Sequence, residues 1–404
     1  MAWPAKLKQL GLNLLLGLGG VGFAFGVAEI GLRLAGISYP SFYQVDPNRG
    51  HALIPNFSGQ WTHEGNGFVQ INRDGLRDKD HAIPKPEQTY RIAVLGDSFT
   101  EAIQINADQT FWAKLERGLA SCPALGEKKP EVINFGVGDY GTAQALMTLR
   151  HQVGKYQPNL VLLAIFTGND LVNNSRVLSP PDRLSPYLVQ HQGQWVMDTS
   201  FNQTQTYQRR DSWPRRVVFS MINHSRVLQV LHEARRVWGT GQGLAGQVKN
   251  DDIIPSLDFD ANLYHPPTSP AWQEAWASTE ALLTQFNQES QALGANFVAV
   301  TLSNPPQVYP DLKVRQRLRE LGAQNLFYPE QRLAQWGQQQ HVPVLNLAPE
   351  LQAYSDRQRA FLHGFENTAP GIGHWNALGH QVAGQLLTTK LCPLLAEEGK
   401  HSPN

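Results

Sequence analysis

The sequence has only two cysteines, Cys122 and Cys392, which are too few for a disulfide framework. They could pair in an oxidising compartment or stay as free thiols, and the sequence leaves both alternatives open. The thirteen histidines are scattered along the chain. A Cys/His cluster with zinc spacing, an HExxH motif and an EF-hand loop are all missing, so no motif predicts a bound metal ion.

The chain also lacks an excess of charge of either sign. It has 34 basic and 34 acidic residues in a length of 404, which gives no electrostatic reason to expect nucleic acid as a partner. The length exceeds that of a typical domain, but one α/β domain with insertions can account for it.

Charge is missing altogether from a stretch of twenty residues, Gln9 to Ala28, which is mostly Leu, Gly, Val and Phe. Twenty helical residues can cross the hydrocarbon core of a bilayer. Because Lys6 and Lys8 precede the stretch, we predict a membrane anchor over 1–36 with a cytoplasmic N-terminus and the rest in the periplasm or outside the cell. A signal peptide cleaved after 26–28 and a buried core helix are the alternatives.

After this segment, residues 37–89 are rich in Pro, Gly, Asn and aromatic residues. The stretch "FVQINRDGLRD" alternates apolar and polar residues up to Asn72 and then turns at Asp74-Gly75. This pattern predicts a β-rich lead-in segment that packs beside the main domain.

The main domain is expected over 90–395, where short apolar runs alternate with helix-like stretches. Continuous apolar strands of this kind indicate a parallel sheet with helices on both faces. We therefore predict an α/β fold, a three-layer α/β/α sandwich with a five-stranded parallel sheet in the flavodoxin-like order 2-1-3-4-5. The five runs are "RIAVLG" (91–96), "EVINFGV" (131–137), "NLVLLAIF" (159–166), "NFVAVTL" (296–302) and "VPVLNLA" (342–348).

A long polar excursion, about 172–269, separates the third run from the fourth. It is too long for a simple connection, and "RVVFSMINHSRVLQVLHEARRVW" within it has helical periodicity. We interpret it as an inserted lid or specificity element, with a disordered spacer as the alternative.

Polar residues follow the first three runs, at the strand ends where ligands bind in such sheets. They are Gly96-Asp97-Ser98, then "NFGVGDYGT" (134–142), then Gly168-Asn169-Asp170. In the predicted strand order these three ends lie side by side. A hydroxyl, a glycine-rich turn and a carboxamide in one place predict acyl transfer at a serine nucleophile.

Each component of such a site has a candidate. Ser98 is the predicted nucleophile, and its own N–H, the turn at Gly138-Asp139 and the Asn169 amide are predicted to bind the oxyanion. His374, in "GIGHWNALGH" just before the last helix, is the predicted base, whereas His380 within that helix is interpreted as a packing or surface residue.

These four blocks resemble those of the SGNH, or GDSL-type, hydrolase superfamily: "LGDSFT", "NFGVGDYGT", "TGND" and "GHWNALGH". The resemblance covers about 90–390, and "INRDGLRD" is similar to the lead-in of membrane-anchored bacterial members. It implies a three-layer α/β/α sandwich and esterase, lipase or acetyl-transfer chemistry that needs no cofactor.

The sequence departs from the superfamily pattern at two places. Members usually carry an Asp two or three residues before the base, but the three residues before His374 in this chain are Gly371, Ile372 and Gly373. A Ser–His dyad, a backbone carbonyl that holds His374, or another acid such as Glu366 could replace it. The oxyanion glycine aligns with Asp139, which keeps a backbone N–H but brings a carboxylate that would oppose an oxyanion unless it points away.

The function that we predict is a membrane-anchored serine esterase. It would hydrolyse or transfer an O-acyl group, such as O-acetyl, on a carbohydrate or lipid. One alternative is an accessory protein that passes acetyl groups from a membrane acyltransferase partner to an envelope polysaccharide. The other is a non-catalytic glycan-binding protein, which the missing Asp and the residue at 139 would favour.

Overall fold

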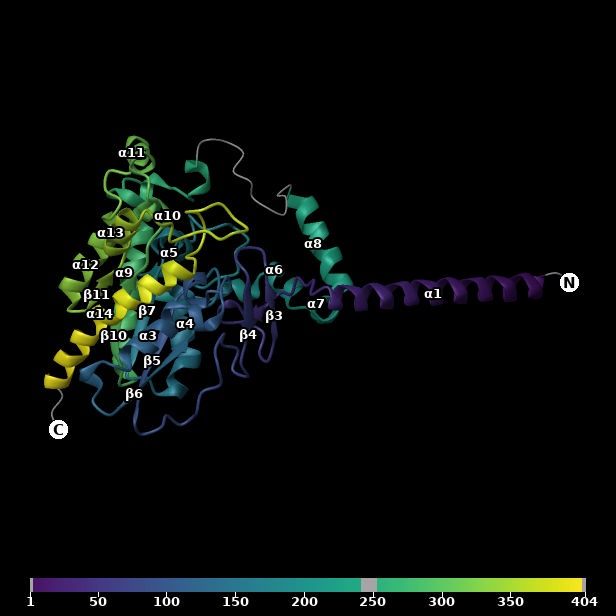
Figure 1. The fold of residues 1–404 in the computed structure, drawn as a ribbon, viewed down its shortest axis with the longest axis horizontal. Helices are drawn as coiled ribbons and strands as arrows, with labels where there is room; N and C mark the ends of the chain where they lie inside the picture. Colours follow the sequence, from purple (N-terminus) through teal and green to yellow (C-terminus); the bar gives the residue numbers. More distant parts are fainter. Residues whose placement is uncertain (1–2, 241–252, 402–404) are drawn as a thin grey trace. The chain divides into compact units, whose positions relative to one another are not determined.

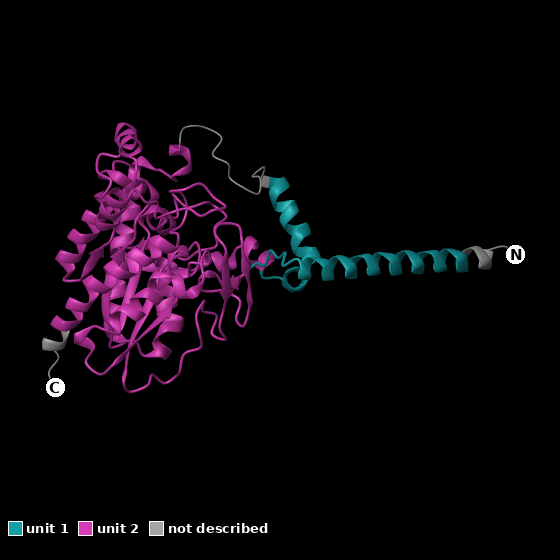
Figure 2. Ribbon diagram, viewed as in Figure 1, with its two compact units in different colours: residues 1–41, 211–244 teal, residues 42–210, 245–404 magenta. Residues whose placement is uncertain are grey.

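The computed structural model describes residues 3–240 and 253–401 of the chain. The chain divides into two compact units, which Figure 2 shows in different colours. One consists of residues 1–41 and 211–244, and the other of 42–210 and 245–404.

The larger unit is built on a five-stranded parallel sheet (Figure 1). Its strands lie in the order β11-β10-β7-β5-β6, which is 2-1-3-4-5 when the five are numbered along the chain. The predicted fold class is confirmed. The strands are β5 (Thr89–Leu95), β6 (Lys129–Asn134), β7 (Leu160–Ile165), β10 (Asn296–Thr301) and β11 (Val344–Asn346).

Helices cover both faces of this sheet, and β7 shows why its sequence is apolar throughout. Every residue of β7 is buried, and successive side chains enter opposite cores. Val161 and Leu163 pack with one set of helices, whereas Leu160 and Leu162 pack with the other. The first set is α4 (Thr142–Thr148), α9 (Pro270–Ala292) and α12 (Tyr328–Gln340), and the second is α3 (Phe111–Leu119), α13 (Ala348–Gln358) and α14 (Ala377–His401).

Three short helices follow strands β5, β7 and β10 in the same unit, and a fourth follows the last of these helices. They are α2 (Ser98–Glu101), α5 (Thr167–Asn174), α10 (Pro305–Val308) and α11 (Leu312–Glu320).

The two cysteines are paired. The Cys122–Cys392 disulfide joins the chain just after α3 to α14, with 5.8 Å between the two Cα atoms. The alternative of free thiols is therefore wrong.

The lead-in forms two antiparallel strand pairs, as its alternating pattern predicts. A small core of their apolar side chains includes Ile103 and Val137 from the loops that follow β5 and β6, so the lead-in packs at the polar edge of the sheet. The pairs are β1 (Tyr43–Asp46) with β2 (Gly50–Leu53), and β3 (Ser58–Trp61) with β4 (Gly67–Gln70).

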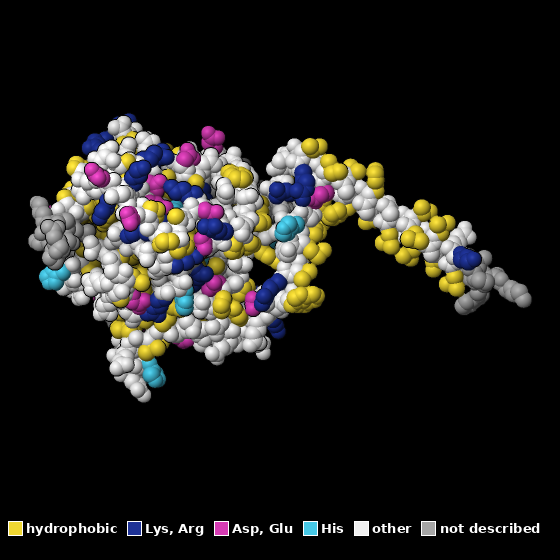
Figure 3. Space-filling view, turned by 90° about the horizontal axis from the view of Figure 1, so that it is seen from below, with side chains coloured by type: hydrophobic (Ala, Val, Ile, Leu, Met, Phe, Trp, Pro, Cys, Tyr) yellow, Lys and Arg dark blue, Asp and Glu magenta, His cyan; other side chains and the backbone are white. Residues whose placement is uncertain are grey.

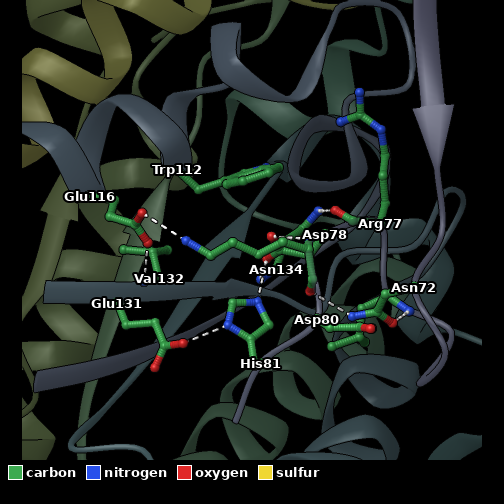
Figure 4. Close-up of polar contacts among 12 residues, drawn as sticks. Asn72, Arg77, Asp78, Asp80, His81, Trp112, Glu116, Glu131, Val132 and Asn134 are labelled. Carbon is green, nitrogen blue, oxygen red and sulfur yellow. Dashed lines mark hydrogen bonds and ion pairs between the residues drawn. The ribbon is translucent and has the colours of Figure 1, made fainter. Parts of the chain in front are cut away.

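A buried polar network connects the lead-in to β6 (Figure 4). The His81 side chain is inaccessible to solvent; its Nδ1 lies 2.7 Å from Glu131 Oε1 and its Nε2 lies 3.3 Å from Asp78 Oδ2. Arg91 makes an ion pair of 2.6 Å with the same Glu131. Burial lowers the pKa of His81, but the two carboxylates outweigh burial and raise it to about 9.

We expect this histidine to make the stability of the protein depend on pH. A raised folded-state pKa adds stability that is complete below the unfolded pKa of 6.5 and is lost as pH rises through about 9. The free energy of unfolding should fall by up to about 3 kcal/mol over this range, because a tenfold change in proton affinity is about 1.4 kcal/mol. Urea titrations at several pH values should show this fall for the wild type and the exposed-site control His151→Gln, but not for His81→Gln.

The excursion between β7 and α9 is not a single element. Its first part stays in the larger unit and forms the hairpin β8 (Tyr187–His191) and β9 (Gln194–Asp198), followed by α6 (Gln205–Arg210). The helical stretch predicted from periodicity forms α7 (Trp213–His224) and α8 (Arg226–Thr240), which belong to the smaller unit. The part at 241–252 lies outside the described residues.

The smaller unit contains α1 (Trp3–Leu34). Its segment Leu7–Leu34 has 28 residues and contains an 18-residue window with a mean hydropathy of 1.8, none of which is buried. By length and composition it is a candidate membrane span or signal sequence. A buried core helix, the third alternative, is wrong because none of that window is buried among the residues that the structure describes.

Candidate active site

Three side chains from distant parts of the sequence form a hydrogen-bonded chain at the polar edge of the sheet. His374 Nε2 lies 2.7 Å from Ser98 Oγ, and His374 Nδ1 lies 2.6 Å from Glu64 Oε2. Ser98 and His374 are 276 residues apart in the sequence, and Glu64 and His374 are 310 apart. Serine, imidazole and carboxylate in this order are the arrangement of a serine-hydrolase triad.

Ser98 is the first residue of α2, directly beyond the end of β5. Asp97 Oδ1 accepts a hydrogen bond of 2.9 Å from the Phe99 N–H and caps this helix. Gly96 lets the chain turn there, because a Cβ at this position would collide with the Thr100 side chain and the Ala164 carbonyl. The turn after this apolar run therefore presents the Ser98 hydroxyl at the edge of the sheet.

His374 lies in the loop between α13 and α14, and the loop is held by a second histidine. The buried His363 forms a hydrogen bond of 2.7 Å between its Nδ1 and the Gly373 carbonyl, and its backbone pairs with Trp375 in an isolated bridge. Burial lowers the pKa of His363 to about 4. At neutral pH His363 is therefore neutral and its Nδ1–H can donate to that carbonyl.

Glu64 comes from the loop between β3 and β4. One oxygen, Oε1, accepts the backbone N–H of His374 at 2.7 Å, while Oε2 contacts the imidazole. The side chain of Asn367 fastens the two loops together, because it accepts from the Gly65 N–H and donates to the carbonyls of Thr62 and Gly65.

Gly373, directly before the base, leaves room for an acid from another part of the chain. A Cβ on Gly373 would collide with Glu64 Oε1, so this position is empty to admit a carboxylate from elsewhere. Glu366, the candidate named from the sequence, is exposed, and the residue that contacts His374 is Glu64 instead. Glu64 and His374 are 310 residues apart, and no motif or spacing in a single sequence indicates that their loops meet. The sequence therefore did not identify Glu64.

Electrostatics within this group favour the protonated imidazole. Burial lowers the pKa of His374, but the hydrogen bond and charge of Glu64, together with the charges of Asp97 and Glu101, outweigh burial and raise it. Burial raises the pKa of Glu64, yet its contacts with His374 outweigh burial and lower it. Glu64 therefore stays ionised and can stabilise an imidazolium.

The predicted oxyanion residue Asn169 lies beside the serine turn. Its Nδ2 donates to Asp97 Oδ2 at 3.1 Å, which fixes the amide at the adjacent end of β7. Asp170, in the first turn of α5, accepts a hydrogen bond of 2.9 Å from the N–H of Phe166, the residue before this helix. Burial raises the pKa of Asp97 to about 6, and burial together with the charge of Asp97 raises the pKa of Asp170.

The glycine-rich turn after β6 approaches the serine turn through a hydrogen bond of 3.2 Å from the Val137 N–H to the Gly96 carbonyl. Gly138 is required there, because a Cβ would lie 2.6 Å from both Glu101 Oε2 and the Tyr43 hydroxyl. Asp139 has a φ of 63°, a left-handed conformation that glycine adopts more easily.

The carboxylate of Asp139 is held by an arginine from the excursion. Arg183 Nη1 donates to both carboxylate oxygens at 2.9 Å, and its Nη2 donates to the Asp139 carbonyl. The Asp139 side chain remains two-thirds exposed. This clamp neutralises the charge that the sequence places at the predicted oxyanion turn.

Removing the clamp should therefore slow any reaction that builds negative charge at this turn. We expect Arg183→Ala to lower kcat by roughly tenfold, since it frees a carboxylate near the developing charge. Adding Asp139→Asn in that background should restore most of the rate. Arg210→Ala, which breaks a 3.9 Å ion pair with Asp182 in the same excursion, is the control. A double variant as slow as Arg183→Ala would contradict the effect of charge and show that Arg183 acts only by holding the shape of the turn.

His380 lies within α14 and outside the triad. It is buried, stacks against Phe111 with ring centroids 6.0 Å apart, and its Nδ1 accepts the Phe111 N–H at 3.2 Å. The structure therefore gives it a packing role, as the sequence predicted.

The sequence matches no family model and no curated protein. Among solved structures, it is similar to a catalytic mutant of the acetylxylan esterase Axe2 from Geobacillus stearothermophilus, with 9% identity, 75% of this chain and 94% of that chain covered, and a TM-score of 0.36. It is also similar to the acetyl xylan esterase AlAXEase, with 12% identity, 74% and 99% covered, and a TM-score of 0.34.

A third similar structure is a protein assigned to the G-D-S-L family from Desulfitobacterium hafniense DCB-2, with 9% identity, 74% and 99% covered, and a TM-score of 0.32. At such identities and TM-scores the similarity carries no information about the reaction, which has to come from the geometry of the site.

Proposed function

We propose that this protein is a serine esterase that cleaves O-acyl esters. The observation that carries the proposal is the unbroken chain of hydrogen bonds from Ser98 Oγ through His374 to Glu64. The non-catalytic alternative drew on the glycines before His374 and on Asp139. Both now have a structural account: Gly373 admits Glu64, and Arg183 neutralises Asp139.

In the proposed reaction His374 Nε2 removes the hydroxyl proton as Ser98 Oγ attacks the ester carbonyl. Glu64 stabilises the resulting imidazolium, and backbone N–H groups with Asn169 stabilise the oxyanion. The C–O bond to the alcohol then breaks, and the imidazolium gives its proton to the leaving oxygen. Water activated by His374 releases the acid from the acyl-serine.

We propose a short acyl group, such as acetyl, on a carbohydrate or lipid alcohol.

We further propose that α1 stays in the chain as a single-pass anchor and that the larger unit lies in the periplasm or outside the cell. Lys6 and Lys8 before the apolar segment favour a cytoplasmic N-terminus. The Cys122–Cys392 disulfide supports an oxidising compartment for the larger unit.

The proposal can be tested with the full-length protein in detergent. We expect saturable hydrolysis of p-nitrophenyl acetate, faster than that of p-nitrophenyl palmitate, and covalent labelling of Ser98 by a fluorophosphonate probe. Peptide mass spectrometry identifies the labelled residue. Absence of both turnover and labelling in protein with an intact disulfide would contradict an esterase.

A further inference from the structure

The helix pair α7–α8 is hydrogen-bonded to α1 within the smaller unit. Glu29 of α1 caps the start of α8: its carboxylate accepts from the Ser225 hydroxyl at 3.0 Å and from the N–H groups of Arg226 and Val227 at 3.0 and 3.1 Å. Arg33 donates to the His224 carbonyl at 2.8 Å. The junction of α7 and α8 is therefore fixed to the last turns of α1.

The position of this attachment along α1 sets its depth in a membrane. The twenty uncharged residues from Gln9 to Ala28 have a helical length of about 30 Å, which is the thickness of the hydrocarbon core. Glu29 and Arg33 come directly after them. If Gln9–Ala28 crosses the bilayer, the α7–α8 junction lies at the level of the lipid headgroups.

Both helices carry exposed apolar stripes. In α7, Trp213, Val217 and Met221 are spaced four residues apart and share one face, and they are 75%, 40% and 57% exposed. In α8, Leu231 and Trp238 are spaced seven apart, and they are 60% and 86% exposed. Figure 3 shows hydrophobic side chains along α1 and the adjoining part of this unit. Large exposed apolar side chains in such stripes mark an interaction surface.

The charge of the helix pair indicates what this surface meets. Residues 213–240 contain a single carboxylate, Glu233, which pairs with Arg236 at 2.6 Å. They also contain five arginines, of which Arg216 pairs with Asp211 just before α7 at 2.8 Å, so the helix pair keeps an excess of positive charge. Exposed tryptophans, apolar stripes and an excess of arginine on helices are the features of an amphipathic segment that lies on an anionic bilayer. The arginines are Arg215, Arg216, Arg226, Arg235 and Arg236.

We propose that α7 and α8 bind the surface of the membrane that α1 crosses, with their apolar stripes among the acyl chains and their arginines at anionic headgroups. This inference rests on the proposed span but not on the esterase activity. A helix pair at this depth would add a second attachment to the bilayer and restrict the tilt of the smaller unit.

The test uses single cysteines, which are unique free thiols because the two native cysteines are paired. Leu231→Cys and Met221→Cys report on the stripes, and Val21→Cys reports on the span. Leu312→Cys in α11 is the matched control, because Leu312 is an exposed leucine like Leu231, 69% against 60%. Each variant of the full-length protein is labelled with bimane and reconstituted into vesicles of equal parts phosphatidylethanolamine and phosphatidylglycerol, with or without acyl-brominated lipid.

We expect brominated lipid to reduce bimane fluorescence about twofold at positions 231, 221 and 21 and to leave position 312 unchanged. The reduction at 231 and 221 should weaken in phosphatidylcholine vesicles. Quenching at 21 with none at 231 and 221 would overturn the surface contact and leave the span in place. Lack of quenching at 21 would overturn the span and this inference together. Disulfide cross-linking between two copies at 231 without quenching would assign the stripe to self-association and also overturn it.

Discussion

Replacing Ser98 by alanine is expected to lower kcat for p-nitrophenyl acetate by at least about 10⁴-fold, because loss of a triad nucleophile leaves only oxyanion stabilisation and binding. KM should change little, since the hydroxyl contributes to the transition state more than to substrate binding. The structure gives this serine no structural task, because Asp97 caps α2 without it. The variant should therefore retain the stability of the wild type.

The same residue allows a test of whether the triad acts as a unit. His374→Ala should be nearly as slow as Ser98→Ala, and the double variant should be no slower than either. The two residues act in the same step, so the second substitution removes no further rate enhancement. Ser121→Ala, at an exposed serine, is the control and should match the wild type. A Ser98→Ala variant that keeps the wild-type rate would remove the proposed function.

The sheet, Ser98 and His374 could be predicted from the sequence, because each has a pattern of neighbouring residues that marks it and these patterns follow one another in a fixed order. Each strand is a continuous apolar run, and β7 keeps this pattern because both of its faces are buried. Ser98 follows one such run directly, and His374 precedes a clear terminal helix. The order of strands then places both at one edge, where a hydrogen bond joins the two side chains.

The attachment of the excursion to α1 and the identity of the acid could not be predicted from the sequence. Residues 216–238 have ordinary helical periodicity, and nothing in it reveals that Glu29, about 200 residues earlier, caps α8. Glu64 likewise stands in a turn between two short strands, where an acidic residue is unremarkable. Both contacts depend on how distant segments of the chain meet, which a period of 2 or 3.6 residues does not encode.

The identity of the acid is the finding most open to a decisive test, because two glutamates compete for the role. Glu64→Gln keeps the shape of the side chain but removes its charge, and it presents an amide to the imidazole. We expect kcat to fall on the order of 10⁴-fold, since the carboxylate orients the imidazole and stabilises its protonated form. Glu366→Gln is the matched control and should keep the wild-type rate, because its side chain is exposed.

The pH profile separates this effect from a general loss of structure. Glu64 raises the pKa of His374, and the reaction needs the neutral imidazole, so kcat/KM of the wild type should rise with pH through that raised pKa. Removing the carboxylate lowers the pKa of His374, so the acid limb of Glu64→Gln should move to lower pH although its maximum is lower. Glu64→Asp, which keeps the charge on a shorter side chain, should recover part of the rate and keep the acid limb near its wild-type position. A full rate in Glu64→Gln with a deficit in Glu366→Gln would reverse the assignment.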